Sequence, residues 1–220
     1  GAYFLYRYRI NQLLRVQKVR NNISSDLHDD IGARLTNINI LTMLGKQNVK
    51  QPETTSSYLT RIANEIQSSG EALDDIVWSI NSSNDSLPEI IARMRRYAAD
   101  AFDATNISLQ FNSDKQLLNH SVDMEQRRDL FLVYKEAINN IQKHAQATAV
   151  NINVREEKRS IRITINDNGK GFDVTQPTHR NGLKNMQSRI EKWKGNFTIT
   201  SSLETGTVIN ISLPEKHTNL

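Results

Sequence analysis

Residues 161–172 of this 220-residue chain read IRITINDNGKGF. Apolar and polar side chains alternate over the first five of these residues, and they alternate again over 150–154, where the sequence is VNINV. Alternation with a period of two is typical of half-buried strands, and the charged turn between the two runs predicts an antiparallel hairpin. The glycine-rich stretch that follows is typical of a turn when it is taken alone.

Helices and shorter strands are expected on both sides of this hairpin. Apolar residues at helical spacing predict helices over 87–105, 122–144 and 183–193. Further strands are predicted over 107–111, 197–200 and 208–213. Together these elements predict a sheet with helices on one face, which is a two-layer α/β sandwich.

The N-terminal part of the chain carries a different periodicity. Apolar residues recur every three or four positions from Val19 to Leu41 and again from Leu59 to Ile80, with the helix-breaking sequence GKQNVKQP at 45–52 between them. Two amphipathic helices joined by a turn are therefore predicted. A lone hairpin leaves half of its apolar stripe in water, so we expect two copies to form a dimeric four-helix bundle. The predicted fold class is α+β.

The polar stretch at 81–86, NSSNDS, has the composition of a linker, and we expect it to act as a hinge. The predicted organisation is a helix start over 1–20, a helical domain over 21–83 and an α/β domain over 84–220. The aromatic run at 3–6 is followed by Arg7 and Arg9, the order found where a transmembrane helix enters a basic cytoplasmic flank. The alternative is the start of an ordinary amphipathic helix.

Composition and charge exclude several classes of function. The chain has no cysteine, which excludes disulfides, thiolate metal sites and cysteine nucleophiles. Its 28 basic and 24 acidic residues are interspersed, so no nucleic-acid partner is expected despite a sequence pI near 9.3. No run of apolar residues approaches the roughly 20 that cross a bilayer.

A histidine stands beside the first helical stripe. The sequence SSDLHDDIGARL at 24–35 places His28 one position after Leu27, and this rotates it by about 100° away from the stripe toward solvent. Asp29 can hold the proton of one ring nitrogen and leave the lone pair of the other for nucleophilic attack. Taken alone, the same pattern describes a surface histidine among helical charges.

A polar cluster lies on the predicted helix before the hairpin. In the sequence EAINNIQKH at 136–144, Glu136, Asn140, Lys143 and His144 are spaced so that they share one helix face. An amide oxygen is a ligand suited to Mg²⁺, and nearby Lys and His side chains can contact phosphate oxygens.

The glycine-rich stretch and the segments after it complete a candidate nucleotide site. Asp167 at the end of a strand can accept a hydrogen bond from an adenine amino group, while Gly169 and Gly171 allow the backbone to approach the nucleotide. The polar loop at 173–181 ends on a predicted helix start at Gly182, which suits phosphate. The Walker pattern is absent, so a P-loop enzyme is not expected.

Four motifs in this order resemble those of bacterial two-component sensor histidine kinases. They are DLHDDIG at 26–32, EAINNIQKH at 136–144, DNGKG at 167–171 and GLKNM at 182–186. The subfamily is the nitrate-sensor and membrane-fluidity-sensor type, in which Leu-His-Asp marks the phosphoacceptor helix. The resemblance implies a dimerisation and histidine-phosphotransfer domain followed by an ATP-binding domain of the gyrase, Hsp90 and MutL type.

The resemblance also implies a reaction and its partners. His28 would take the γ-phosphate of ATP, while Asp29 would orient the ring or accept its proton. The phosphoryl group would then pass to an aspartate of a response regulator. The chain would work as a homodimer, as the cytoplasmic portion of a receptor anchored in the inner membrane upstream of this segment.

The nucleotide-binding residues of the family have counterparts here, and the implied cofactors are ATP and Mg²⁺. Asn140 corresponds to the Mg²⁺ ligand. The polar residues at the phosphates correspond to Glu136, Lys143 and His144. The remaining counterparts are Asp167 at the adenine, Gly169 and Gly171 in the turn beside it, Gly182 at the end of the lid and Thr207 near the base.

Two positions depart from the family pattern. Many relatives carry Gln five residues after the phosphoacceptor, where it is thought to position the water that dephosphorylates the regulator; Ala33 stands here, which puts regulator phosphatase activity in question. Arg180 replaces the first glycine of the lid motif, as a stiffer lid or an extra cation near the phosphates. The alternative functions are a nucleotide-binding dimeric scaffold and another ATPase of the same superfamily.

Overall fold

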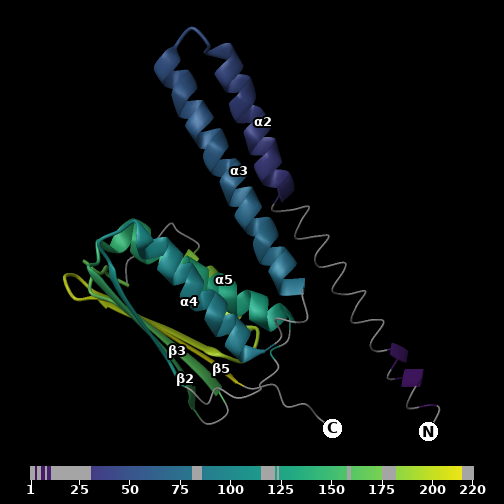
Figure 1. Cartoon of the computed structure of the whole chain (residues 1–220), viewed down its shortest axis with the longest axis vertical. Helices are drawn as coiled ribbons and strands as arrows, with labels where there is room; N and C mark the ends of the chain where they lie inside the picture. The colour runs from purple at the N-terminus through teal and green to yellow at the C-terminus, as the bar shows by residue number, and fades with distance from the viewer. Residues whose placement is uncertain are drawn as a thin grey trace. The chain divides into compact units, whose positions relative to one another are not determined.

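The computed structural model (Figure 1) describes most of the chain as two compact units, Gly1–Trp78 and Ser79–Leu220. The described residues are 31–80, 86–114, 122, 124–157, 160–174 and 182–214, together with Tyr3, Tyr6, Arg7, Arg9 and Ile10. No helix in this part of the chain combines the length and apolarity needed to cross a membrane.

The first unit contains the predicted helical hairpin over its described part, while residues 19–30 of the first predicted helix lie outside the described residues. Helices α2 (Gly32–Gln47) and α3 (Pro52–Ile80) run side by side in opposite directions (Figure 1). The Asn48 carbonyl in the turn accepts hydrogen bonds from the backbone N–H of Gln51 and the hydroxyl of Thr55, both at 2.8 Å. Helix α2 extends three residues into the predicted turn, to Gln47, because glycine near the end of a helix costs little.

Much of the apolar stripe of this hairpin faces outward. Leu41 is only 2% exposed, but Leu35 is 54% exposed on α2, and Leu59 and Ile66 are 61% and 58% exposed on α3. Glu65 of α3 makes polar contacts to α2, since its Oε1 accepts a hydrogen bond from Asn37 Nδ2 at 2.8 Å and its Oε2 lies 3.7 Å from Arg34 Nη1. The hairpin therefore presents an apolar surface that its own two helices leave uncovered.

The second unit is built on a five-stranded sheet with strand order β1-β2-β3-β5-β4. The strands are β1 (Ser108–Ser113), β2 (Ala149–Glu157), β3 (Ser160–Asp167), β4 (Asn196–Ser202) and β5 (Gly206–Pro214). β1 pairs in parallel with β2, and the other neighbours are antiparallel. Ile152 faces Ile165 in the β2–β3 pair, so the predicted hairpin is confirmed.

Helices pack against one face of this sheet, as Figure 1 shows for α4 and α5. The helices are α4 (Leu87–Asp103), α5 (Met124–Asn140), the π-helical turn η3 (Ile141–Ala145) and α6 (Gly182–Glu191). The Tyr134 hydroxyl ties α5 to α4 by donating to the Met94 carbonyl at 2.9 Å, and burial raises the pKa of this phenol. The predicted two-layer sandwich is confirmed.

Candidate functional site

Asp167 closes the inner strand β3 and faces Thr207 at the start of β5. It is only 4% exposed, and its Oδ1 accepts a hydrogen bond from the backbone N–H of Gly169 at 2.9 Å. Burial raises the pKa of the Asp167 carboxyl, while hydrogen bonds from Gly169 and from the backbone and hydroxyl of Thr207 oppose part of that rise. The site therefore holds a shielded carboxyl in a fixed orientation.

Two glycines shape the backbone around this carboxyl. Gly171 and Gly206 both have positive φ, 61° and 83°, which disfavours any residue with a Cβ. A Cβ at Gly171 would overlap the carbonyl oxygen of Ser202, and a Cβ at Gly206 would overlap that of Asp167. The loop after β3 and the start of β5 thus approach each other more closely than other residues allow.

The loop after β3 is also bound to the end of η3. The Lys170 N–H donates to the Ala145 carbonyl at 2.8 Å, and a Cβ at Gly169 would overlap the same oxygen. Asn168 adds a second tie, since its Oδ1 accepts the Ala149 N–H at 2.8 Å. The glycine loop and the segment that follows η3 therefore form one rigid corner.

The polar cluster of 136–144 is divided between two kinds of helix. Glu136 and Asn140 lie half-buried in α5, whereas Lys143 and His144 are exposed on η3. A single α-helix was predicted here, and apolar spacing cannot reveal the extra residue per turn of a π-helix. Such turns are rare and occur frequently at functional sites.

Helix α6 begins beside the polar cluster of α5. A Cβ at Gly182 would lie 2.7 Å from Oε1 of Glu136, so the N-terminus of α6 and this carboxylate are in direct contact. The backbone N–H groups of a helix N-terminus favour anionic ligands. The contact places such a terminus next to the helix that continues into η3.

The structure gathers the predicted binding residues into two groups. One comprises Glu136 and Gly182, and the other comprises Asp167, Gly169 and Thr207, which adjoin Gly171. The corner at Ala145 connects the second group to η3, which carries Lys143 and His144. In the described part of the chain no cluster of three His, Asp or Glu residues could hold a metal ion. The role of Asn140 as a Mg²⁺ ligand stays a prediction.

The predicted phosphoacceptor cannot be placed against these groups. His28 and Asp29 lie outside the described residues, and so does Arg180 in the predicted lid. Their roles stay predictions.

Ser201 on β4 is a contributor that the sequence did not reveal. Its Oγ donates to the Gly206 carbonyl at 2.9 Å, accepts the Phe172 N–H at 2.9 Å and lies 3.0 Å from Thr207 Oγ1. One hydroxyl thus connects the glycine loop with the start of β5. Ser201 could be recognised as a site residue only from its pairing with Thr207, and this pairing is known only once the register of β4 on β5 is known.

Two protein families match this chain in the predicted order. Residues 19–85 match the family described as "Histidine kinase", and residues 125–217 match the "Histidine kinase-, DNA gyrase B-, and HSP90-like ATPase" family. The second match covers both groups of site residues. The α/β unit is therefore an ATP-binding domain of that family.

Individual proteins agree with the two families. The chain is 40% identical over 86 residues to the signal transduction histidine-protein kinase/phosphatase DegS of Brevibacillus brevis, covering 39% of this chain and 22% of DegS. It is 24% identical over 217 residues to UhpB of Salmonella typhimurium, a protein of the same description, covering 91% of this chain and 40% of UhpB. The chain thus spans less than half the length of either relative.

The fold agrees as well. The structure of the Acinetobacter baumannii histidine kinase AdeS superposes with a TM-score of 0.57 at 13% identity, covering 86% of this chain and 98% of that structure. The order of helical hairpin and sandwich domain is therefore shared with a histidine kinase. On the two family matches, the chain belongs to the sensor histidine kinases.

Proposed function

We propose that this chain is the kinase region of a two-component sensor, which autophosphorylates His28 with ATP and passes the phosphoryl group to an aspartate of a response regulator. The observation that carries this proposal is the shielded Asp167 carboxyl, fixed by Gly169 and Thr207 in a corner bound to η3. Such a corner suits a base at one end and phosphates at the other.

The carboxyl would recognise the base. An ionised Asp167 accepts hydrogen bonds only, which selects a ligand with an amino group such as adenine. Gly169 and Thr207 already orient the carboxyl, so binding a ligand costs little further conformational entropy at this side chain. Ser201 supports the same end of the site through its bonds to Gly206 and Phe172.

The phosphates would lie toward η3 and the start of α6. Lys143 and His144 are exposed hydrogen-bond donors there, and the N-terminus of α6 at Gly182 adds the partial positive charge of a helix dipole. Asn140 offers an amide oxygen for Mg²⁺, which binds few protein ligands and keeps waters and phosphate oxygens as the others. When bound, Mg²⁺ would offset the negative charge of the phosphates.

The phosphoryl group would move in line from ATP to the imidazole. The bond from a ring nitrogen of His28 to the γ-phosphorus forms as the bond to the bridging oxygen of ADP breaks. Asp29 would hold the proton of the other ring nitrogen, keeping the attacking lone pair free. We place a hinge at 81–86, because the ATP-binding domain must deliver its phosphate to the helical one.

A second copy of the chain would cover the open stripe of the hairpin. Leu35, Leu59 and Ile66 are more than half exposed, and burying the exposed part of each side chain would favour association by about 1–2 kcal/mol. Two hairpins would thereby form a four-helix bundle. We assign the helical start to 1–20, this dimerisation and phosphotransfer domain to 21–83 and the ATP-binding domain to 84–220.

The arrangement of the longer protein is also a proposal. The aromatic and basic residues at 3–9 favour a membrane anchor upstream, with this region on the cytoplasmic side. The interspersed charges favour a protein partner over nucleic acid, and the aspartate of a response regulator is the proposed acceptor.

The first experiment is phosphorylation with γ-labelled ATP and Mg²⁺, comparing wild type with His28→Ala and Asn140→Ala. We expect acid-labile, base-stable label in wild type and none in either variant. Label that survives in His28→Ala would mean that another residue is the nucleophile. Nucleotide binding without any label in wild type would favour the scaffold over the kinase.

A further inference from the structure

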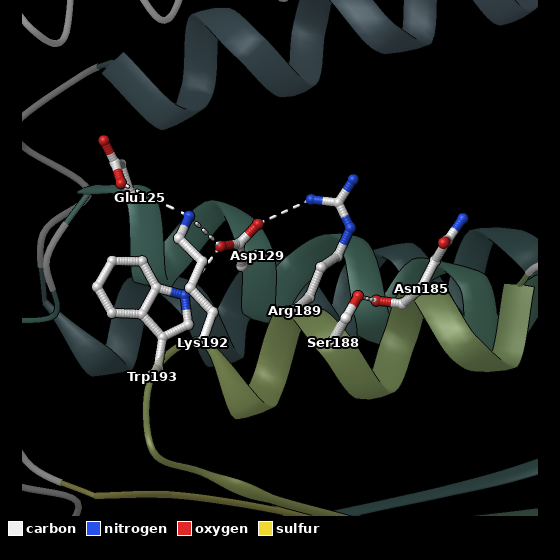
Figure 2. A network of polar contacts seen from close by, with 7 residues as sticks. All are labelled: Glu125, Asp129, Asn185, Ser188, Arg189, Lys192 and Trp193. Carbon is white, nitrogen blue, oxygen red and sulfur yellow. Dashed lines mark hydrogen bonds and ion pairs between the residues drawn. The ribbon is translucent and has the colours of Figure 1, made fainter.

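A network of polar contacts surrounds the carboxylate of Asp129 in the helical layer (Figure 2). Asp129 of α5 is only 6% exposed and accepts three hydrogen bonds from the end of α6 and the turn after it. The donors are Arg189 Nη1 at 2.7 Å, Trp193 Nε1 at 2.8 Å and Lys192 Nζ at 3.0 Å. Lys192 Nζ also lies 3.6 Å from Glu125 Oε2.

These bonds hold one end of α6, while the other end contacts the proposed phosphate site. Gly182 begins α6 beside Glu136, and Arg189 stands near its end beside Asp129. Asp129 precedes Glu136 on α5 by as many residues as Gly182 precedes Arg189 on α6, about 10 Å along each helix. The two contacts therefore fix the antiparallel register of α6 on α5.

The apolar contacts of α6 do not define this register by themselves. Met186 and Ile190 are its buried side chains. Apolar packing is not directional, whereas hydrogen bonds to a charged group require defined distances and angles. The carboxylate of Asp129 is thus the directional anchor of a short helix whose first residue adjoins the site.

We propose that Asp129 is a positioning residue for the nucleotide site, which acts through α6 and sets the place of Gly182 against Glu136. The inference rests on the proposed function. Asp129 itself touches neither group of site residues in the contacts described above. Asp129 would affect the reaction through the affinity for ATP, because it fixes the start of α6, which faces the phosphates.

The test is Asp129→Asn in the full chain, with Glu191→Gln as the matched control. Both replace an acid by its amide, but Glu191 is exposed on α6 and its Oε1 accepts only the Gln187 amide of the same helix, at 2.7 Å, among the bonds described. For each variant the ATP dissociation constant and the initial rate of His28 labelling against ATP concentration are measured well below its unfolding temperature.

We expect Asp129→Asn to raise the dissociation constant and the half-saturating ATP concentration by about five- to tenfold, since ATP would then have to order the start of α6 on binding. The labelling rate at saturating ATP should change much less, and Glu191→Gln should behave as wild type. A purely structural role would lower the unfolding temperature and leave ATP binding by the folded protein unchanged.

A milder variant covers the case in which Asp129→Asn does not fold. Arg189→Met removes one of the three donors from a side chain that is 43% exposed, and a smaller loss of ATP affinity in the same direction is expected. If folded Arg189→Met, and Asp129→Asn where it folds, bind ATP as tightly as wild type, the positioning role is overturned but the proposed function is not. A wild-type chain that binds no ATP would overturn the proposed function, and the inference with it.

Discussion

Replacing Gly171 by alanine tests whether the corner around Asp167 is needed to hold a nucleotide. Gly171 has a φ of 61°, and an added Cβ would overlap the Ser202 carbonyl and lie 3.0 Å from that of Gly206. The obstructing atoms belong to backbone in a turn, where the Glu204 N–H donates to the Lys170 carbonyl at 2.7 Å. No flexible side chain is available to move aside.

The cost follows from these two features. An alanine in the left-handed region costs about 1–2 kcal/mol, and relieving the overlap adds about 1–3 kcal/mol. The free energy of unfolding of the α/β unit should therefore fall by about 2–5 kcal/mol. At about 3–6 °C per kcal/mol for a domain of this size, the unfolding temperature should fall by at least ~6 °C.

Calorimetry of the full chain measures this loss, and ATP titration at low temperature measures the effect on binding. A loop pushed out of place would have to be reordered when ATP binds, so ATP affinity should fall by about tenfold. Gly70→Ala is the control, because nothing lies within 4 Å of a Cβ there and alanine in a helix is favourable. An unfolding temperature and ATP affinity equal to those of wild type in Gly171→Ala would refute the reasoning.

Three further predictions concern the carboxyl, the dimer and the regulator. Burial raises the pKa of Asp167 above its ordinary value near 3.8, so the native state binds this proton more tightly than the unfolded chain does. The free energy of unfolding should then fall as pH rises from 3.8 through the folded pKa, and Asp167→Asn should flatten that slope in urea unfolding at a series of pH values. Ile66→Asp should yield a helical monomer in analytical ultracentrifugation, whereas exposed Asn64→Asp should stay dimeric; a dimeric Ile66→Asp would exclude the proposed interface. Wild type should dephosphorylate its regulator slowly, and Ala33→Gln should accelerate this reaction by supplying an amide that orients water. Equal rates of dephosphorylation in the two proteins would show that residue 33 has no role in this reaction.

The sequence predicts those parts of the fold whose signal repeats along the chain. Alternation over 150–154 and 161–165 defines a hairpin, because a shift by one residue would turn every isoleucine to solvent. The helical stripes work in the same way. The π-helical turn at Ile141–Ala145 is a single turn with no repeating sequence pattern of its own, so the apolar spacing there predicts an ordinary α-helix.

The candidate site was predictable where single motifs carry it. The DNGKG sequence contains Asp167, Gly169 and Gly171, and the structure joins Asp167 to Gly169 by a direct hydrogen bond. The sequence does not predict the roles of Ser201 and Asp129, because their hydrogen-bond partners lie on another strand or another helix. Only the register of β4 on β5 and of α6 on α5 brings them into contact.

The pairing of β1 with β2 has a consequence for how this domain assembles. Asn112 and Asn153 are partners in the parallel pair, although 41 positions separate them, whereas only two residues of sequence separate the paired ends of β2 and β3. Closing a long loop costs entropy before any contact repays it, so the hairpins should form early and β1 should add late. Until it does, β2 is an open edge with a row of unpaired amides, and a newly made chain is most prone to aggregate through that strand.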